Sequence, residues 1–414
     1  MAVELRTVTE SEFPDWLRAL RTGFLNEPVV PGELVADRIA HVDLDRTRAA
    51  VEDGRVVATF RSFGQRLSTV GGGSLAADAV TQVTVAPTHR RRGLLSRLMA
   101  LDLDAARERG DAVATLIAAE YPIYGRYGFG PASWTTEWSV DLRRAGLDPR
   151  RSGRPEDGGR IDLCDGPEVR RIGPALHRRL AGARAGVTDR TARNWEVATG
   201  LGHHLEPWTE PYYAVYRAAS GEPEGYVSYR CDDKWGDAKQ PETTLTVRDL
   251  VAATPAAEHA LWRFVCSVDW VMTVRSGYRA PDDPLPLLLP DPRAARTVSH
   301  ADMLWLRVLD VVRVLEERTY PVTDGLVLEV RDATGYAEGR YLLDASPKGA
   351  RCTRTTASAD LVLDVAVLAR LVLGDASAVR LASLGLAEEA VPGAAARAEL
   401  LFRAPLRAFS PDIF

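Results

Sequence analysis

Cysteine is rare in this chain of 414 residues, and its four cysteines are widely separated. No Cys-x-x-Cys pair occurs, so we expect neither a zinc ribbon nor a disulfide framework. We expect the thiols to be reduced, as in a cytoplasmic protein. Lysine is also scarce: only three of the 52 basic residues are lysine, a bias that we attribute to a GC-rich genome rather than to chemistry. The cysteines are Cys164, Cys231, Cys266 and Cys352.

Long apolar runs are missing as well. No stretch approaches the ~20 apolar residues that a membrane-spanning helix needs. The first residues carry no basic segment followed by an apolar one, so we expect no signal peptide. The formal net charge of −5 provides no overall positive field, and we therefore expect neither nucleic acid nor a membrane as a partner. With 46% hydrophobic and 26% charged residues, the composition is that of a globular protein.

Two stretches rich in proline and charge divide the chain, Asp148–Gly159 and Ala280–Pro292. Such composition is typical of linkers or of surface crossings. The two stretches predict three domains, over residues 1–147, 148–295 and 296–414. Each of these is long enough to bury a core of its own.

The first of these domains alternates strand and helix patterns. Val56–Phe63 and Gln82–Val85 are rich in β-branched residues and predict strands. Leu94–Glu108 predicts a helix, because its leucines and alanines recur at steps of three and four residues. Ala112–Ala118 and Trp134–Val140 predict two further strands. The pattern indicates an α/β layer around a mostly buried sheet.

The second domain contains one echo of the first. Leu250–Pro255 ends a strand and enters a helix over Glu258–Val268. Val85–Thr88 does the same in the first domain, but the arginines and the glycine that follow it there are absent from the second copy. We interpret the similarity as a duplication.

The third domain indicates an α+β arrangement. Strand patterns lie at Leu304–Val308, Leu326–Val330 and Tyr341–Leu343, and a helix pattern lies at Val365–Leu373. We find no catalytic motif in this part of the chain.

The clearest chemical signal follows the strand at Gln82–Val85, where the sequence is Ala-Pro-Thr-His-Arg-Arg-Arg-Gly-Leu-Leu. The first N–H groups of a helix have no intrahelical partner, and with the helix dipole they bind anions. Gly93 lets the backbone approach a phosphate, and Arg90 through Arg92 add forked donors. No Lys-Ser/Thr pair follows, so nucleotide hydrolysis is not indicated. The alternative is a solvated basic turn before an ordinary helix.

This order of strand, proline, arginines, glycine and helix resembles the GCN5-related N-acetyltransferases (GNAT fold). Their acetyl-CoA pyrophosphate loop is Gln/Arg-x-x-Gly-x-Gly/Ala, which Arg90 through Leu95 fits except that Leu95 replaces the small sixth residue. The resemblance implies that the backbone of Val83 and Val85 binds pantetheine and polarises the thioester carbonyl. The N–H groups that would cradle the pyrophosphate are those of Arg91, Arg92, Gly93, Leu94 and Leu95.

A second segment, Ile123–Ala132, narrows the resemblance. Its sequence, Ile-Tyr-Gly-Arg-Tyr-Gly-Phe-Gly-Pro-Ala, is together with the arginine loop similar to the enhanced intracellular survival (Eis) acetyltransferases of actinobacteria. Their chains also end in phenylalanine, here Phe414. The resemblance implies mixed α/β sheets in two fused GNAT domains, the second degenerate, followed by a sterol-carrier-protein-like domain. It also implies a homo-oligomer, either a hexamer or a trimer.

The same resemblance implies two proton-transfer groups. In the family a tyrosine protonates the CoA sulfur and the C-terminal carboxylate acts as the base, and the matching groups here are Tyr124 and the carboxylate of Phe414. A phenol with a pKa near ~10 is protonated at neutral pH. A chain terminus is usually free, but the segment Phe409–Phe414 is apolar enough to dock. We expect acetyl-CoA as the co-substrate and no metal, because His203 and His204 lack a ligand-spaced partner.

Eis proteins are best known for acetylating aminoglycosides, and some acetylate lysine side chains. We expect the acceptor pocket around the early helices, with Phe24 and Asn26 in it. Some aminoglycoside-acetylating members carry Asp where this chain has Asn26, and Glu where it has Ile413, so two negative charges are missing. The acidic residues that are candidates to compensate are Glu27, Glu33, Asp37 and Asp412.

Three functions stay open at the level of sequence. The leading one is an N-acetyltransferase for amine-rich small molecules of the aminoglycoside type. The second is a lysine N-acetyltransferase acting on peptides or proteins. The third is a non-catalytic lipid-binding or scaffold protein in which the GNAT loop is vestigial.

Overall fold

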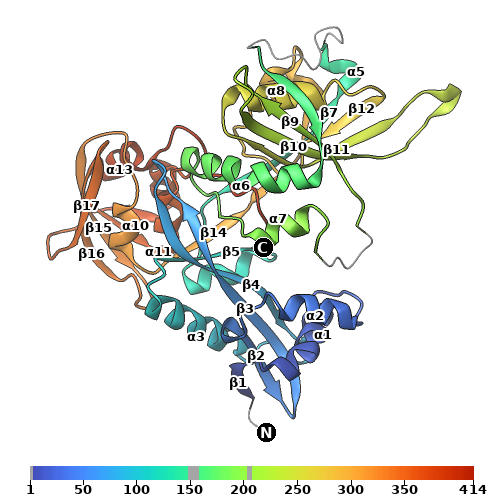
Figure 1. The fold of residues 1–414 in the computed structure, drawn as a ribbon. Coiled ribbons are helices and arrows are strands. Elements are labelled where there is room, and N and C mark those ends of the chain that lie inside the picture. Colours follow the sequence, from blue (N-terminus) through green and yellow to red (C-terminus); the bar gives the residue numbers. More distant parts are fainter. Residues whose placement is uncertain (1–2, 148–157, 203–207) are drawn as a thin grey trace.

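The protein is described here from a computed structural model that covers residues 3–147, 158–202 and 208–414. Residues 148–157 of the first expected linker, and His203 and His204, lie outside the described residues. The described chain forms three sheets, each with its own helices, and the C-terminus lies between the first two (Figure 1). No helix within the described ranges is both long and apolar enough to cross a bilayer.

The first sheet has seven strands in the order β1-β2-β3-β4-β5-β14-β6. All neighbours are antiparallel except β4 and β5, which are parallel and are joined through the helix α3 (Leu94–Glu108). This helix begins and ends where the leucine spacing predicts, and it buries its apolar face on the sheet. The strands are β1 (Glu4–Thr7), β2 (Thr47–Glu52), β3 (Arg55–Ser68), β4 (Ser74–Val85), β5 (Val113–Ile117), β6 (Gly130–Pro131) and β14 (Leu304–Val308).

Of two early helices, α1 (Phe13–Gly23) packs on β3 and β4 of this sheet, and α2 (Gly32–Ile39) packs on α1. The helix α1 has Pro14 at its first turn, where the missing N–H costs nothing. Its buried face includes Trp16, whose indole N–H donates to the backbone carbonyl of Arg48 on β2 at 2.9 Å. This hydrogen bond fastens α1 to the first sheet.

The second sheet also has seven strands, in the order β13-β7-β12-β11-β10-β9-β8. Its parallel pair, β11 and β12, is joined through α8 (Pro255–Val265), which repeats the arrangement of β4, α3 and β5. The helices α6 (Gly166–Ala183) and α7 (Ala192–Ala198) also belong to this domain. The strands are β7 (Trp134–Asp141), β8 (Arg160–Cys164), β9 (Tyr212–Arg217), β10 (Pro223–Cys231), β11 (Thr243–Ala252), β12 (Val271–Arg275) and β13 (Ala295–Asp302).

The third sheet has five strands in the order β17-β16-β15-β18-β19. The predicted strands at Leu326–Val330 and Tyr341–Leu343 lie within β15 and β16. Its strands are β15 (Asp324–Arg331), β16 (Gly339–Ser346), β17 (Gly349–Arg354), β18 (Leu361–Asp364) and β19 (Ala387–Glu389).

The remaining α-helices of the described chain, from all three domains, are α4 (Tyr121–Tyr124), α5 (Leu142–Ala145), α9 (Leu285–Leu288), α10 (Val311–Glu316), α11 (Val365–Val372), α12 (Ala378–Ser383) and α13 (Ala394–Phe402).

Two strands pair outside the part of the sequence to which we assigned them. The strand predicted over Trp134–Val140 is present as β7, but it pairs with β12 and β13 in the second sheet rather than with the first. The strand at Leu304–Val308 is present as β14, but it lies between β5 and β6 of the first sheet. The residue pattern predicts that a segment is extended, but it does not predict which strands pair with it, because packing decides the pairing. The domain boundaries near residues 147 and 295 stay predictions.

Candidate active site

A cavity of about 610 Å³ lies where β4 and β5 separate. The two strands pair only from Ala77 to Ala79 on β4, so Val83 and Val85 have no partner strand on the β5 side. The separation coincides with an irregularity: Gln82 has a left-handed φ of +55°, and the register with β3 shifts at this level. Backbone N–H and C=O groups at the end of β4 are therefore available to a ligand.

The loop after β4 leads into a helix whose N-terminus is open. Arg91 and Gly93 both have left-handed φ values, +63° and +74°. No side chain caps the first N–H groups of α3, and Gly93 lines the cavity. A left-handed turn followed by an uncapped helix of 15 residues presents several N–H donors and the positive end of the helix dipole to the cavity.

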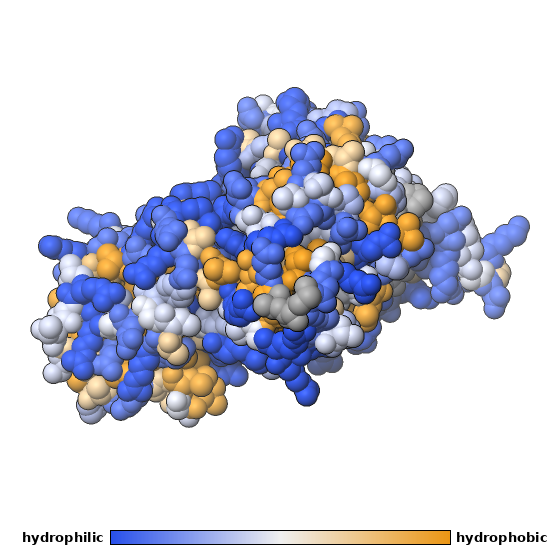
Figure 2. All heavy atoms as spheres, turned by 90° about the horizontal axis from the view of Figure 1, so that it is seen from below, coloured by the Kyte–Doolittle hydropathy of each residue, from blue (hydrophilic) through white to orange (hydrophobic). Residues whose placement is uncertain are grey.

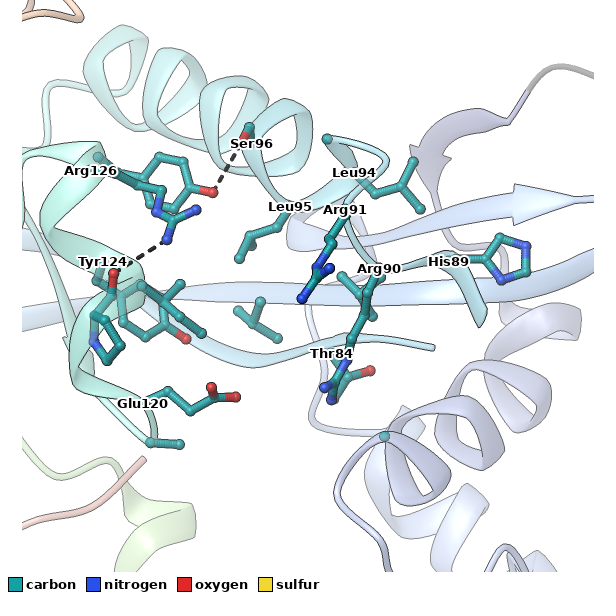
Figure 3. A pocket seen from close by; sticks show the side chains of 18 of the residues that line it. Thr84, His89, Arg90, Arg91, Leu94, Leu95, Ser96, Glu120, Tyr124 and Arg126 are labelled. Atoms are coloured by element: carbon teal, nitrogen blue, oxygen red, sulfur yellow. Dashed lines mark hydrogen bonds between the residues drawn. The ribbon is translucent and has the colours of Figure 1, made fainter. Parts of the chain in front are cut away.

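The three arginines of this loop are not equivalent. Arg90 and Arg91 line the cavity, and within the described residues neither forms an ion pair (Figure 3). Arg92 instead donates to Glu52 of β2 at 2.6 Å, and His89 lies 2.7 Å from the same carboxylate. Hydrogen bonds from Arg92 and His89 lower the pKa of Glu52 to about 2. Of the three loop arginines, two therefore add their positive charge to the cavity, and Arg126 on the opposite wall also lines it.

Tyr124 faces this loop from the opposite wall, which is built by α4 (Figure 3). Its side chain is only 9% exposed and packs edge-on against Phe129. Burial, helped by the nearby Glu120 and Tyr127, raises the pKa of Tyr124 above its usual value. The phenol is thus protonated at neutral pH, and its hydroxyl has no hydrogen-bond partner among the described residues.

The cavity contains functional candidates that the sequence did not single out. Glu120 is the N-cap residue of α4, yet its carboxylate makes no capping hydrogen bond. It extends into the cavity and is the one acidic residue among the described residues that line it (Figure 3). Ser96 of α3 bonds the hydroxyl of Tyr127 at 3.0 Å, and Arg126 donates to the carbonyl of Pro122 at 3.4 Å. The sequence feature that could have indicated Glu120 as a site residue is its position four residues before Tyr124.

The end of α1 forms the remaining wall. Phe24 lines the cavity, whereas Asn26 does not. Gly23 lies so close to β4 that a Cβ there would fall 2.4 Å from the Cβ of Thr84. Seen from below, the surface is mostly hydrophilic, with apolar side chains gathered over its middle (Figure 2).

Two acidic residues expected near the acceptor are already paired. Asp37 of α2 accepts from Arg193 of α7 at 2.5 Å. Asp412 accepts from the Nε of Arg190 at 2.9 Å. Phe414 packs its ring edge-on against Phe63 of β3, with 5.6 Å between centroids, and it is not among the residues that line the cavity.

The equivalent position in the second sheet is closed. The helix α8 begins with Pro255, and the side chain of Thr254 accepts from the N–H of Ala257 at 3.2 Å. This cap occupies a donor that remains free in α3. Among the described residues no group of three or more His, Cys, Asp or Glu side chains is arranged as metal ligands would be.

Comparison with known proteins places these features in a family. The sequence profiles of two GNAT acetyltransferase domains match residues 4–132 and 186–314, and that of a sterol carrier protein domain matches residues 311–410. The chain is 60% identical over 416 residues to an N-acetyltransferase of Streptomyces griseus, and the alignment covers all of both chains. It is 36% identical over 331 residues to the N-acetyltransferase Eis of Mycobacterium bovis, covering 77% of this chain and 76% of that one.

The chain belongs to the Eis family of N-acetyltransferases. The crystal structure of Eis1 from Mycobacterium abscessus has the same architecture, with a TM-score of 0.85 and 30% identity over 99% of this chain and 100% of that one. The expected fold class, two GNAT domains followed by a sterol-carrier domain, is confirmed. Membership in the Eis family makes the chain an acyltransferase, so the non-catalytic scaffold alternative is set aside.

Proposed function

We propose that the protein transfers an acetyl group from acetyl-CoA to primary amines of aminoglycoside-like polyamine small molecules. One observation carries this proposal. The open N-terminus of α3, with Arg90 and Arg91, faces Tyr124 and Glu120 across a single cavity. The anion site suits the pyrophosphate of CoA, the protonated phenol can donate to the departing thiolate, and the carboxylate attracts a cationic amine.

The groups proposed to hold acetyl-CoA fit its chemistry. The uncapped N–H groups from Arg91 to Leu95, with Arg90, would bind the pyrophosphate, and the free edge of β4 at Val83 and Val85 would bind the pantetheine. When bound, acetyl-CoA supplies the activated acetyl group. Arg92 would contribute its backbone N–H, because its guanidinium is engaged by Glu52.

Tyr124 is proposed as the general acid. Its phenol keeps its proton at neutral pH and has no competing hydrogen-bond partner among the described residues, so it can donate to a thiolate leaving group. The carboxylate of Phe414 is proposed as the base that takes the proton of the amine. The docking of the Phe414 ring on Phe63 supports this role, because it keeps the chain end from fraying.

The acceptor is proposed to be cationic because Glu120 supplies negative charge within the cavity. Phe24 adds an aromatic face at the end of α1. Asn26 and Ile413 carry no charge, and Asp37 and Asp412 are paired, so we expect a narrower range of aminoglycosides than in relatives with acidic residues there. The second domain, with its capped α8, is proposed to bind no acetyl-CoA. A cytoplasmic homo-oligomer, either a trimer or a hexamer, completes the proposal.

The test is release of CoA by the full chain with a free C-terminus, given acetyl-CoA and aminoglycosides, polyamines or a lysine peptide. We expect turnover with the aminoglycosides, a loss of about 100-fold or more in kcat for Tyr124→Phe, and a comparable loss on deletion of Phe414. Tyr127→Phe is the matched control, since its hydroxyl lines the same cavity but is engaged by Ser96. Turnover with the lysine peptide alone would favour the lysine acetyltransferase. Absence of acetyl-CoA binding would refute the proposal.

A further inference from the structure

The last six residues cross from the second domain to the first sheet. The N–H of Phe409 donates to the carbonyl of Ala185 at 3.0 Å, and Ser410 is fully buried. At the other end, the ring of Phe414 meets Phe63 of β3. Between these two contacts, Ile413 is 62% exposed, so its side chain adds little to the docking of the segment. Asp412 is the polar side chain that anchors it.

Asp412 is held by a bidentate ion pair. The guanidinium of Arg190 lies 2.8 Å from Oδ1, with its Nε donating to both carboxylate oxygens at 2.9 and 3.0 Å. The ring of His177 is nearby, with Nε2 3.7 Å from Oδ2. Burial alone would raise the pKa of Asp412, but His177 and Arg190 outweigh it and hold the pKa below its usual value. The carboxylate therefore stays charged and paired across the neutral range.

Arg190 is itself immobilised by the second domain. Its Nη1 donates to Asp249 of β11 at 2.6 Å and to the hydroxyl of Tyr226 of β10 at 3.2 Å. The guanidinium also lies over the ring of Trp195 of α7, 5.1 Å from its centroid. The side chain of Arg190 is only 9% exposed. It therefore links the second domain rigidly to the C-terminal segment Phe409–Phe414.

We propose that Arg190 is a positioning residue for acetyl transfer, because it fixes Asp412 and thereby sets where the terminal carboxylate of Phe414 lies. The inference rests on the proposed role of that carboxylate as the base. Only one residue separates Asp412 from Phe414, so loss of the ion pair leaves the ring contact with Phe63 to hold the chain end and lets the terminal carboxylate shift. A misplacement of about 1 Å in a reacting group can lower the rate 100-fold. The second domain thus contributes to catalysis in the first without binding its ligand.

The variant Asp412→Asn tests this role with little risk to folding, since it is isosteric and leaves Arg190 paired with Asp249. We expect kcat to fall about tenfold to 100-fold, with the KM for acetyl-CoA and the melting temperature unchanged. Asp324→Asn is the matched control. Asp324 forms a similar bidentate pair with Arg397 in the third domain, far in sequence from the tail, and its loss should leave kcat unchanged.

A double-mutant cycle separates positioning from a merely structural effect. In a chain lacking Phe414, Asp412→Asn should lower kcat no further, because the group that Arg190 positions is already gone. A second readout needs no activity: carboxypeptidase A should release Phe414 faster from Asp412→Asn than from the unaltered chain.

The outcomes distinguish the two proposals. Full activity after deletion of Phe414 would overturn the base in the proposed function, and the positioning role with it. Activity lost on that deletion but unchanged in Asp412→Asn would overturn the positioning role alone. Additive losses in the double variant, or an unchanged rate of Phe414 release, would also overturn it.

Discussion

At the scale of single residues, charge in the cavity is divided between two walls. Arg90 and Arg91 place positive charge at the helix N-terminus, and Glu120 places negative charge beside Tyr124. Arg126 also lines the wall of Glu120. The loop arginines with the helix N-terminus would attract an anionic co-substrate, and Glu120 is the group that would attract a cationic acceptor. The motif spacing identified the arginines and Tyr124 but not Glu120, because a glutamate at a strand end is ordinary until the fold turns its carboxylate into a cavity.

Replacement of Glu120 by glutamine should weaken binding of the amine. The substitution keeps the shape and removes the charge, so we expect the KM for a polycationic acceptor to rise about tenfold, roughly the value of one charge-assisted contact. The KM for acetyl-CoA should not change. Steady-state kinetics with each substrate varied in turn measures both values, and Glu120→Asp serves as the charge-preserving control. Equal effects of the two variants would contradict an electrostatic role.

A second residue-scale feature is a buried carboxyl pair behind the first sheet. Asp78 of β4 and Asp102 of α3 are both fully buried, and the carboxylate of Asp102 lies close enough to that of Asp78 to disfavour its negative charge. The Oδ2 atom of each carboxyl group has no hydrogen-bond partner among the described residues. Burial and the neighbouring Asp102 raise the pKa of Asp78 to about 7, although Arg46 lies 2.5 Å away and acts in the opposite direction.

This pair should make stability depend on pH. The native state keeps the proton of Asp78 up to about pH 7, whereas the unfolded state loses it near pH 4, so the native state binds more protons between these values. Stability from this group is therefore lost as pH rises toward 7. Relative to Asp78→Asn, the unaltered chain should lose on the order of 2 kcal/mol between pH 5 and pH 8. Urea unfolding at several pH values measures the difference, and Asp15→Asn, at an exposed position of α1, is the control.

At the scale of elements, the two GNAT domains use one strand–helix–strand plan with different helix starts. The helix α3 starts after a left-handed glycine with its N–H groups free, and α8 starts with a proline and a threonine cap. The residues at these starts are visible in the sequence, and they correctly distinguish the two copies. The cap itself required coordinates, because a threonine before a proline caps only if its side chain turns back onto the helix.

Two glycines at opposite ends of α3 allow a matched experiment on this helix. Gly93 and Gly110 both have left-handed φ values, and a Cβ at either would meet no atom within 4 Å. Alanine at each position should therefore cost a similar ~1 kcal/mol of stability. Only Gly93→Ala should weaken acetyl-CoA binding, by about tenfold, since it disturbs the loop that presents the N–H donors. Isothermal titration with acetyl-CoA tests this, and equal affinities of the two variants would contradict the assignment of the anion site.

At the scale of the whole molecule, the domains contribute strands to one another's sheets and are joined by a buried ion pair. The strand β14 fills the position between β5 and β6, and its Arg307, fully buried, pairs with Asp332 of the third domain at 2.6 Å. The first sheet is therefore complete only when residues beyond 303 are present. A buried pair of this kind is costly to break, about 3–5 kcal/mol, because it leaves an uncompensated charge.

Residues 1–147 alone should consequently not fold stably. Without β14 the edge of β5 is unpaired, and its apolar side chains lose their cover. We expect this fragment to aggregate, and to become soluble when residues 148–414 are produced with it. Size-exclusion chromatography and thermal melting followed by circular dichroism test the expectation. A monomeric fragment with a cooperative melt would contradict it.

The local elements follow from the sequence, because they depend on neighbours within a few residues. Leucine spacing predicted α3 to its end residues, and the order of strand, arginines and glycine predicted the anion-binding helix start. Tertiary structure alone decided what depends on distant partners. In the fold, Arg92 pairs with Glu52 and Glu120 lines the cavity. The strands β7 and β14 belong to other sheets than their sequence positions suggest. Arg190 binds Asp412, which is 222 positions away in the sequence. These contacts depend on burial and strand pairing between distant residues, and no local sequence pattern predicts either of them.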